Sequence, residues 1–333
     1  MKIAFFEVKD WEKEYIKKRI KGKLLFFQEP IDEIPFNLIK DVEVISIFIG
    51  VEINSKILSK LKKIKAIVTR STGYDHINLR ECKKRKIKVY NVPDYGQNTV
   101  AEHTFALILS LSRKINRAYE KTTRGNFSLD ELKGFDLKGK TIGIIGMGSI
   151  GKHVARIANG FEMKILAYDI HSNMEFEKKF HLKYSGMNNL LKNSDIVTLH
   201  CPYNKKTHHL INAKNINLMK KDALLINTAR GGLIDTKELV KALGSKKLGG
   251  AGLDVLEEEG LIKEEAELLS TNFPKEKIES LLENHILLTF NNVIITPHMA
   301  FYSEEALKRI LDTTIENIDS IIKNKPCDSL VKF

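Results

Sequence analysis

The sequence has little cysteine and tryptophan, and it has no long apolar run. Only 3 cysteines and 1 tryptophan occur in 333 residues. Cys82, Cys201 and Cys327 are far apart and show no CxxC or cysteine–histidine spacing, which excludes a disulfide framework and a zinc finger and predicts reduced thiols. No apolar run approaches the roughly 18 residues that a membrane-spanning helix needs. We therefore expect no membrane segment.

An export signal and a nucleic-acid-binding face are also missing. The N-terminal MKIAFF passes directly into charged residues without a small-residue cleavage site, so we expect a cytoplasmic protein. The net charge of +12 comes from lysines scattered through amphipathic segments rather than from a basic stripe interleaved with aromatics, which argues against a nucleic-acid partner. The histidines, His208 and His209 among them, have no metal-ligand spacing, so we expect no metal.

What the sequence does contain is a regular alternation of short β-branched runs and amphipathic stretches, which is typical of parallel-sheet α/β proteins. The length favours two domains of about 150 residues each. We therefore predict two doubly wound parallel-sheet domains, Rossmann-like or flavodoxin-like, with a cleft between them. The first comprises residues 1–98 plus about 299–333, and the second comprises residues 99–298.

Strands and helices follow from the same patterns. The first domain is expected to hold strands at 2–8, 23–27, 44–49, 65–69 and 88–92, and the second a sheet of about six strands, including 164–168, 196–200, 223–228, 249–255 and 293–296. Residues 98–124 lack proline and glycine, which predicts one long linking helix. This helix is more apolar than one buried face requires, which suggests a homodimer contact. A C-terminal helix at 303–323 could pack on either domain.

A GxGxxG motif occupies residues 146–151. It follows the apolar strand TIGII, begins a helix, and precedes a second strand that ends at Asp169. Gly146 permits a tight turn, Gly148 lets a pyrophosphate approach the backbone, and Gly151 lets helix and strand pack closely. Asp169 would bind the ribose hydroxyls and repel a 2′-phosphate, so this pattern predicts NAD rather than NADP as the cofactor of the second domain.

Three charged or titratable side chains follow predicted buried strands of that domain: Arg230, Glu259 and His298. A guanidinium can bind a carboxylate and polarise a carbonyl. An imidazole can donate a proton near neutral pH, and a neighbouring carboxylate can keep that imidazole protonated. Together with NADH, such a set suits the reduction of a small 2-keto acid.

The chain resembles the D-isomer-specific 2-hydroxyacid dehydrogenase family over nearly its whole length, in TRSTGYDHI, NVPDYGQNTVAEHTFAL, GKTIGIIGMGSIGKHVARIA, LLINTARGGLIDTKELV, AGLDVLE and NVIITPHMAF. The resemblance implies that Arg230 binds substrate, that His298 is the acid/base, and that Glu259 raises the pKa of His298. It also implies substrate contacts from the backbone at Thr72 and Gly73 in the first, substrate-binding domain. Cofactor contacts are implied for Ser149, Ile150, Cys201, Pro202, Thr207, Thr228, Ala229 and Asp254.

Tyr95 and Phe301 resemble the D-lactate dehydrogenase branch, in which aromatic residues enclose a small substrate side chain. This likeness implies an enzyme that interconverts pyruvate and D-lactate. Two alternatives remain open: another 2-keto-acid, glyoxylate or hydroxypyruvate reductase of the family, and a non-catalytic NAD sensor like the corepressors that share the fold.

Some assignments within the resemblance also stay open. A long charged segment separates Glu259 from His298, so Glu257 and Glu258 compete with Glu259, which we favour because it stands five residues after Asp254. Thr72 and Gly73 could have a purely structural role as a turn after a strand. Cys201 and Pro202 could likewise serve only to end a strand.

Overall fold

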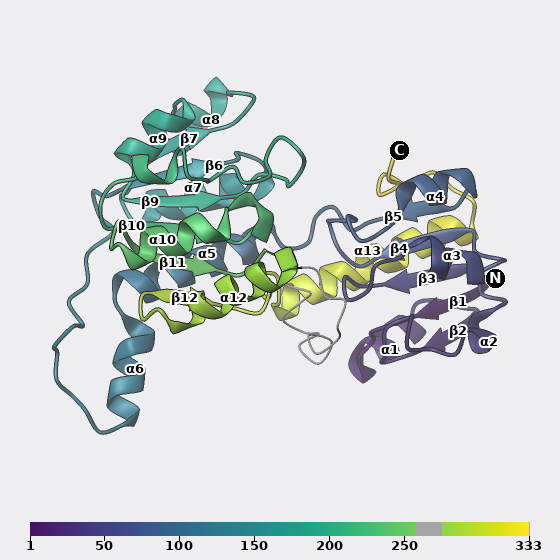
Figure 1. Cartoon of the computed structure of the whole chain (residues 1–333). Coiled ribbons are helices and arrows are strands. Elements are labelled where there is room, and N and C mark those ends of the chain that lie inside the picture. The colour runs from purple at the N-terminus through teal and green to yellow at the C-terminus, as the bar shows by residue number, and fades with distance from the viewer. Residues whose placement is uncertain (258–274, 333) are drawn as a thin grey trace. The chain divides into compact units, whose positions relative to one another are not determined.

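The computed structural model describes residues 1–257 and 275–332. The chain divides into two compact units, Met1–Tyr95 with Tyr302–Phe333, and Gly96–Phe301 (Figure 1). Each unit is built on a parallel sheet, so the predicted fold class of two parallel-sheet α/β domains is confirmed. No helix among the described residues is long and apolar enough to cross a membrane.

The first unit holds a five-stranded parallel sheet in the order β2-β1-β3-β4-β5, the flavodoxin-like order. Its strands are β1 Lys2–Phe5, β2 Lys23–Phe26, β3 Val44–Ile47, β4 Ala66–Thr69 and β5 Lys88–Tyr90. All five predicted strands are present, although several end earlier than expected. In β1 the reason is local, because Glu7 has a φ of 53°, and this left-handed conformation ends the extended backbone.

Helices cover both faces of this sheet. They are α1 Asp10–Lys17, α2 Phe36–Ile39, α3 Ser55–Lys60, α4 Leu79–Lys84 and α13 Glu304–Ile322. Leu311, Ile315 and Ile318 of α13 pack with Ile16 of α1 in one core. Residues of α2, α3 and α4 contribute to the core on the other face. The C-terminal helix therefore belongs to the first unit, with Met1–Tyr95. Its apolar stripe recurs at helical spacing and buries against β4.

The second unit holds a seven-stranded parallel sheet in the order β12-β11-β10-β9-β6-β7-β8. This is the Rossmann order with one added strand, and the order reverses between β6 and β9. The strands are β6 Thr141–Ile145, β7 Lys164–Tyr168, β8 Leu182–Tyr184, β9 Ile196–Leu199, β10 Ala223–Asn227, β11 Leu248–Leu253 and β12 Val293–Ile295. The sequence predicted about six strands and missed β8, because three residues at a sheet edge are too short to show a period of two.

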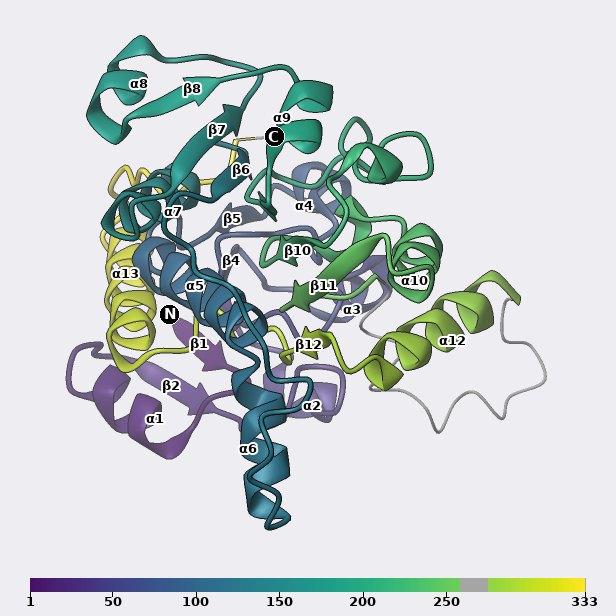
Figure 2. The same ribbon diagram turned by 90° about the vertical axis from the view of Figure 1, so that its left-hand side faces the viewer.

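Helices again lie on both faces of the sheet. They are α5 Gln97–Ser112, α6 Ile115–Thr123, α7 Ser149–Gly160, α8 Met174–Phe180, α9 Met187–Asn193, α10 Thr236–Gly244 and α12 Lys275–Thr289, with 3-10 turns η1 Ile216–Leu218 and η2 Gly231–Leu233. Figure 2 shows α5 and α7 side by side, and both contribute to one core. Residues from α9, η1 and α10 form the core on the opposite face.

The single helix predicted over residues 98–124 is wrong, because the chain breaks between α5 and α6. Lys114 has a φ of 55°, and the carbonyl of Ser112 accepts a hydrogen bond of 3.0 Å from the backbone N–H of Phe135. A residue distant in sequence therefore donates to a carbonyl that would accept a helical hydrogen bond if α5 continued. The break also divides a buried helix from an exposed one, since α5 buries eight residues and α6 buries none.

Candidate active site

The glycine turn between β6 and α7 is held by close backbone packing. Gly146 has a φ of 99°, and a Cβ there would stand 2.6 Å from the carbonyl carbon and oxygen of His200, at the end of β9. A Cβ at Gly151 would stand 2.1 Å from the carbonyl oxygen of Gly146. Glycine is thus required at both positions, by the left-handed backbone at the first and by the contact of helix and strand at the second.

Gly148 is different, because a Cβ there would meet nothing within 4 Å in the described structure. Packing therefore does not explain this glycine. Gly148 precedes Ser149 and Ile150, the first residues of α7, and no side chain of the described structure caps this helix. The first N–H groups of a helix left without a cap attract a phosphate, so the space and the donors fit a pyrophosphate.

Asp169 follows β7 and contacts the glycine turn itself. Its Oδ2 accepts a hydrogen bond of 2.7 Å from the backbone N–H of Met147, and its Oδ1 accepts one of 3.1 Å from His171. The carboxylate therefore joins the end of β7 to the turn where a dinucleotide would lie. The space at Gly148, the free end of α7 and the acid at the next strand together fit NAD.

The end of β9 forms the other side of this turn. Burial lowers the pKa of His200 to about 3, and its Nδ1 is a buried nitrogen without a hydrogen-bond partner in the described structure. Burial also raises the pKa of the Cys201 thiol to about 11. Both side chains are therefore neutral near pH 7, so neither adds a negative charge that would repel an anionic ligand.

Four further predicted cofactor residues occupy ordered loops of the second unit. The Thr207 hydroxyl donates to the carbonyl of Pro202 and closes the turn after β9. Thr228 follows β10 and shares a hydrogen bond of 3.0 Å with Thr104 of α5. The backbone N–H of Ala229 donates to the side chain of Asn227. These contacts order the backbone at the carboxyl ends of β9 and β10.

Arg230 lies three residues after the last residue of β10, Asn227. The side chain of Asn227 accepts from Ala229 and donates 2.8 Å to the carbonyl of Arg230, which closes a turn around these residues. The Arg230 Nη1 donates 2.8 Å to the carbonyl of Ala229. The guanidinium is therefore presented from an ordered turn at the carboxyl edge of the sheet.

His298 follows β12 and has a φ of 53°. Its backbone N–H donates 2.9 Å to the carbonyl of Asp254, and the Asp254 carboxylate accepts from the backbone N–H groups of Met299 and Ala300. Asp254 directly follows β11, the strand between β10 and β12. Because parallel strands end at the same edge, Arg230, Asp254 and His298 share one edge of this sheet.

Asp254 is buried and charged. Burial raises its pKa, but hydrogen bonds from His103, Thr296 and the backbone of Ala300 and Met299 outweigh burial, so the pKa lies below its ordinary value. The sequence predicted a cofactor contact for Asp254, which stays a prediction. In this structure its carboxylate holds the turn that carries His298. His103 was not singled out by the sequence, because its partners lie far away along the chain.

Glu259 and Glu258 lie outside the described residues. Glu257 is described, and its Oε1 lies 2.6 Å from the Nε2 of His209 while its Oε2 accepts 2.9 Å from the Thr236 hydroxyl. Of the three competing glutamates, Glu257 is therefore engaged with partners other than His298 in the described structure.

The predicted substrate residues of the first unit follow β4 and β5. The Thr72 hydroxyl donates 2.9 Å to the carbonyl of Val92, and the Gly73 carbonyl accepts 2.6 Å from the Ser71 hydroxyl. The Tyr95 carbonyl accepts 2.7 Å from the Nε of Arg309. Phe301 belongs to the second unit. A Cβ added to Gly96 would stand 3.5 Å from the Cβ of Phe301, so the two residues lie close together.

Arg70 was missed at the sequence level, although it stands two residues before Thr72 in the TRSTGYDHI motif. Its guanidinium is buried at the end of β4 and donates to the carbonyls of Phe6 and Glu7 and to the Ser46 hydroxyl. Burial lowers its pKa, yet a guanidinium stays charged at neutral pH. A buried cation therefore ties β1, β3 and β4 together below the Thr72–Gly73 turn.

Comparison with known proteins agrees with this geometry. The family model described as D-isomer specific 2-hydroxyacid dehydrogenase, NAD binding domain, matches residues 105–300. The chain is 37% identical to the D-lactate dehydrogenase kk1H of Curvularia clavata, covering 98% of this chain and 94% of that protein. It is 33% identical to the D-lactate dehydrogenase of Escherichia coli, covering 98% of each.

A solved structure is similar over almost the whole chain. The D-lactate dehydrogenase of Aquifex aeolicus, complexed with NAD and lactic acid, superposes with a TM-score of 0.84 at 37% identity, covering 97% of this chain and 96% of that one. The full-length similarity agrees with the geometry of the second unit. Its glycine turn has space for a dinucleotide, and Arg230 and His298 lie at one ordered edge of its sheet. The chain belongs to the D-isomer specific 2-hydroxyacid dehydrogenase family and is an NAD-dependent oxidoreductase.

Proposed function

We propose that this enzyme is a D-lactate dehydrogenase that reduces pyruvate to D-lactate with NADH, reversibly. The observation that carries the proposal is the placement of Arg230 and His298 after β10 and β12, on either side of Asp254 at one sheet edge. The full-length similarity to proteins named D-lactate dehydrogenase favours pyruvate over other 2-keto acids.

Arg230 would bind the carboxylate and the carbonyl oxygen of pyruvate. A guanidinium is planar and offers several N–H donors, so it can hold two oxygens at once and draw electron density from the carbonyl. Bound NADH supplies the hydride for the carbonyl carbon.

His298 would donate the proton to the carbonyl oxygen, and Glu259 would favour its protonated form. An imidazole titrates near neutral pH, and a neighbouring carboxylate raises that pKa. The Asp254 carboxylate accepts hydrogen bonds from the turn after Thr296, and these bonds fix the backbone that carries the His298 imidazole. In the oxidative direction His298 would accept the proton from D-lactate.

Binding is divided between two parts of the chain. We assign substrate binding to residues 1–98 with about 299–333, where the backbone at Thr72 and Gly73 would hold the carboxylate and Tyr95 and Phe301 would enclose the methyl group. We assign NAD binding to residues 99–298. The proposed contacts there are Gly146, Gly148, Ser149, Ile150, Gly151, Asp169, Cys201, Pro202, Thr207, Thr228, Ala229 and Asp254.

A cytoplasmic homodimer is the proposed form of the enzyme. The cysteines are free, as expected in a reducing compartment. In Figure 1, α6 and the loop after it project from the second unit, and they expose Tyr119 by 69%, Phe127 by 78% and Leu129 by 82%. Several large apolar side chains gathered on one projection favour contact with a second copy.

A substrate panel tests the activity. NADH oxidation would be followed with pyruvate, glyoxylate, hydroxypyruvate, phenylpyruvate and 2-ketoisocaproate, and we expect the highest kcat/KM with pyruvate and D-lactate as its product. A higher kcat/KM with a bulkier keto acid would indicate that the enzyme belongs to another branch of the family. Turnover of none of the five would contradict the proposed reaction.

His298→Ala tests the proton donor. We expect kcat to fall by roughly 100-fold or more, because general acid catalysis contributes about that much, while NADH binds with nearly unchanged affinity. The matched control is His181→Asn, an exposed histidine outside the proposed site. Near-normal kcat in His298→Ala would overturn the assignment.

A further inference from the structure

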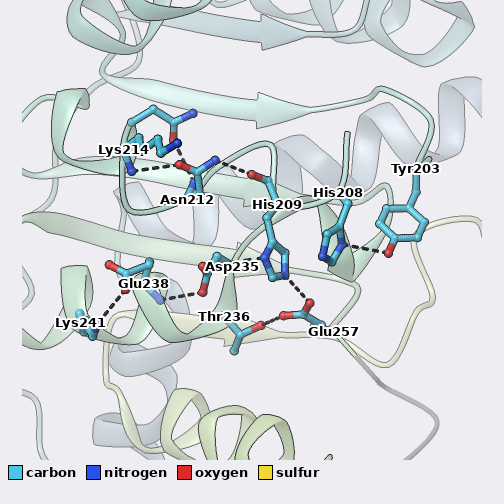
Figure 3. A network of polar contacts seen from close by, with 11 residues as sticks. Tyr203, His208, His209, Asn212, Lys214, Asp235, Thr236, Glu238, Lys241 and Glu257 are labelled. Atoms are coloured by element: carbon cyan, nitrogen blue, oxygen red, sulfur yellow. Dashed lines mark hydrogen bonds and ion pairs between the residues drawn. The ribbon is translucent and has the colours of Figure 1, made fainter. Parts of the chain in front are cut away.

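His208, His209 and Glu257 gather into a cluster that the proposed reaction does not use (Figure 3). Each offers one ligand atom, and these three atoms lie within 4.8 Å of one another. His208 is exposed, and His209 and Glu257 are half-buried. The two histidines follow the turn after β9, and Glu257 follows β11, so the fold joins residues that are far apart in sequence.

Each member of the cluster also has a second polar atom that faces a polar neighbour, within hydrogen-bond distance for His208 and Glu257 and within ion-pair distance for His209. The Nδ1 of His208 lies 3.0 Å from the Tyr203 hydroxyl, and the Nδ1 of His209 lies 3.8 Å from Asp235. The Oε2 of Glu257 accepts from the Thr236 hydroxyl. Metal ligands in proteins are typically oriented by a further side chain at the outer atom, as His208 and Glu257 are here, and Asp235 lies near enough to His209 to orient its ring in the same way.

We propose that His208, His209 and Glu257 bind a divalent transition metal ion of the Zn²⁺ class, with water completing the coordination. Two imidazole nitrogens and one carboxylate oxygen form a set that Zn²⁺ accepts. Mg²⁺ and Ca²⁺ prefer oxygen ligands, so they suit this cluster less well.

Little movement is needed to admit the ion. The Nε2 of His209 and the Oε1 of Glu257 are 2.6 Å apart, and around a tetrahedral Zn²⁺ two such atoms stand about 3.3 Å apart. The ion would replace the hydrogen between them as they separate slightly. The ring of His208 is stacked on His209 at 3.8 Å, and it must tilt to point its nitrogen at the ion, which its exposure allows.

The backbone below the cluster is fixed. His209 has a φ of 49°, its N–H donates 2.8 Å to the carbonyl of Gly232, and its carbonyl accepts 2.7 Å from Asn212. A Cβ on Gly232 would stand 2.7 Å from the ring of Tyr203, so that ring packs directly on the backbone. The backbone of His209 and the ring of Tyr203, which is the outer partner of His208, are thus held before any ion arrives.

Occupancy of the site would also slow turnover, an effect that rests on the proposed function. A Cβ on Gly231, the residue after Arg230, would stand 2.0 Å from the carbonyl of Leu256. Glu257 follows Leu256, and Glu259 comes two residues later. A metal that moves Glu257 slightly away from His209 therefore acts on the backbone next to two proposed catalytic residues, and we expect Zn²⁺ to lower kcat.

Binding is tested on the full chain, freed of metal with a chelator and titrated with ZnCl₂ by calorimetry and with CoCl₂ by visible absorption. We expect one ion per chain. His208→Asn and His209→Asn should each weaken binding by about 100-fold or more, and Tyr203→Phe by about tenfold. Asparagine suits the left-handed backbone of His209, and the exposed His208 can change without unfolding the protein.

His181→Asn is the matched control, since His181 is also exposed and has a φ of 48°; it should bind Zn²⁺ as the wild type does. Absence of binding to the wild type, or unchanged affinity in both His208→Asn and His209→Asn, would overturn the proposal. Because binding is measured without substrate, it is independent of the proposed reaction. A protein that binds Zn²⁺ but turns over none of the five keto acids would refute the proposed function alone.

Discussion

At the residue scale, Gly148 and Gly151 stand three positions apart in one motif but differ in what surrounds them. Space is open at Gly148, while a backbone oxygen lies 2.1 Å from where a Cβ at Gly151 would be. We expect Gly148→Ala to change the free energy of unfolding by less than about 1 kcal/mol and to weaken NADH binding at least tenfold.

Gly151→Ala is the matched comparison. We expect it to destabilise the fold by about 1–3 kcal/mol, because the new methyl group displaces the strand from the helix. Thermal unfolding and NADH fluorescence titration separate the two effects. A strongly destabilised Gly148→Ala would mean that packing, and not the cofactor, requires glycine there.

His200 carries a prediction about pH. Its pKa is lowered by burial to about 3, against about 6.5 in an unfolded chain. Below pH 6.5 the imidazole therefore binds a proton in the unfolded state but not in the folded state, and the free energy of unfolding decreases as the pH falls. Between pH 7 and pH 5 we expect a loss of about 2 kcal/mol from this residue.

Urea unfolding of the wild type and of His200→Gln at both pH values measures this loss. Glutamine does not titrate, so the variant should lose about 2 kcal/mol less than the wild type over the same interval. Equal losses in the two proteins would contradict a buried neutral imidazole.

At the scale of elements, the break between α5 and α6 depends on Gly134. A Cβ on Gly134 would stand 2.1 Å from the carbonyl oxygen of Ser112, next to the hydrogen bond that Phe135 donates to that carbonyl. We expect Gly134→Ala to destabilise the protein by about 1–3 kcal/mol.

Gly160→Ala is the control, because it lies at the end of α7 with nothing within 4 Å in the described structure. Alanine favours a helix, so this variant should be neutral or more stable by up to about 1 kcal/mol. Denaturant unfolding of both variants provides the measurement. A tolerated Gly134→Ala would show that the returning segment does not enforce the break.

At the scale of the whole molecule, the proposed homodimer depends on the exposed apolar side chains after α6. We expect the pair Phe127→Asp and Leu129→Asp to convert the dimer into a monomer of 38.0 kDa, because two buried charges oppose association. Sedimentation velocity gives the mass directly. Met174→Asp, which changes another exposed apolar residue, should remain dimeric, and a wild-type monomer would refute the dimer itself.

The sequence by itself determined the fold class and the cofactor. Alternating strand and helix patterns depend on local periodicity, and the glycine turn, its flanking strand and helix, and Asp169 lie close together along the chain. The five strands of the first unit, the parallel architecture and the NAD assignment therefore could be predicted. The roles of Arg230, Glu259 and His298 also came from motifs, and they stay predictions.

Only the tertiary structure decided the features that depend on residues distant in sequence. The backbone N–H of Phe135 donates a hydrogen bond to the carbonyl of Ser112, and the predicted helix is divided there. Asp254 reaches the turn after Thr296, and Glu257 reaches His209, 48 positions away. These contacts leave no local pattern, because a hydrogen bond or a packed side chain depends on where the folded chain returns.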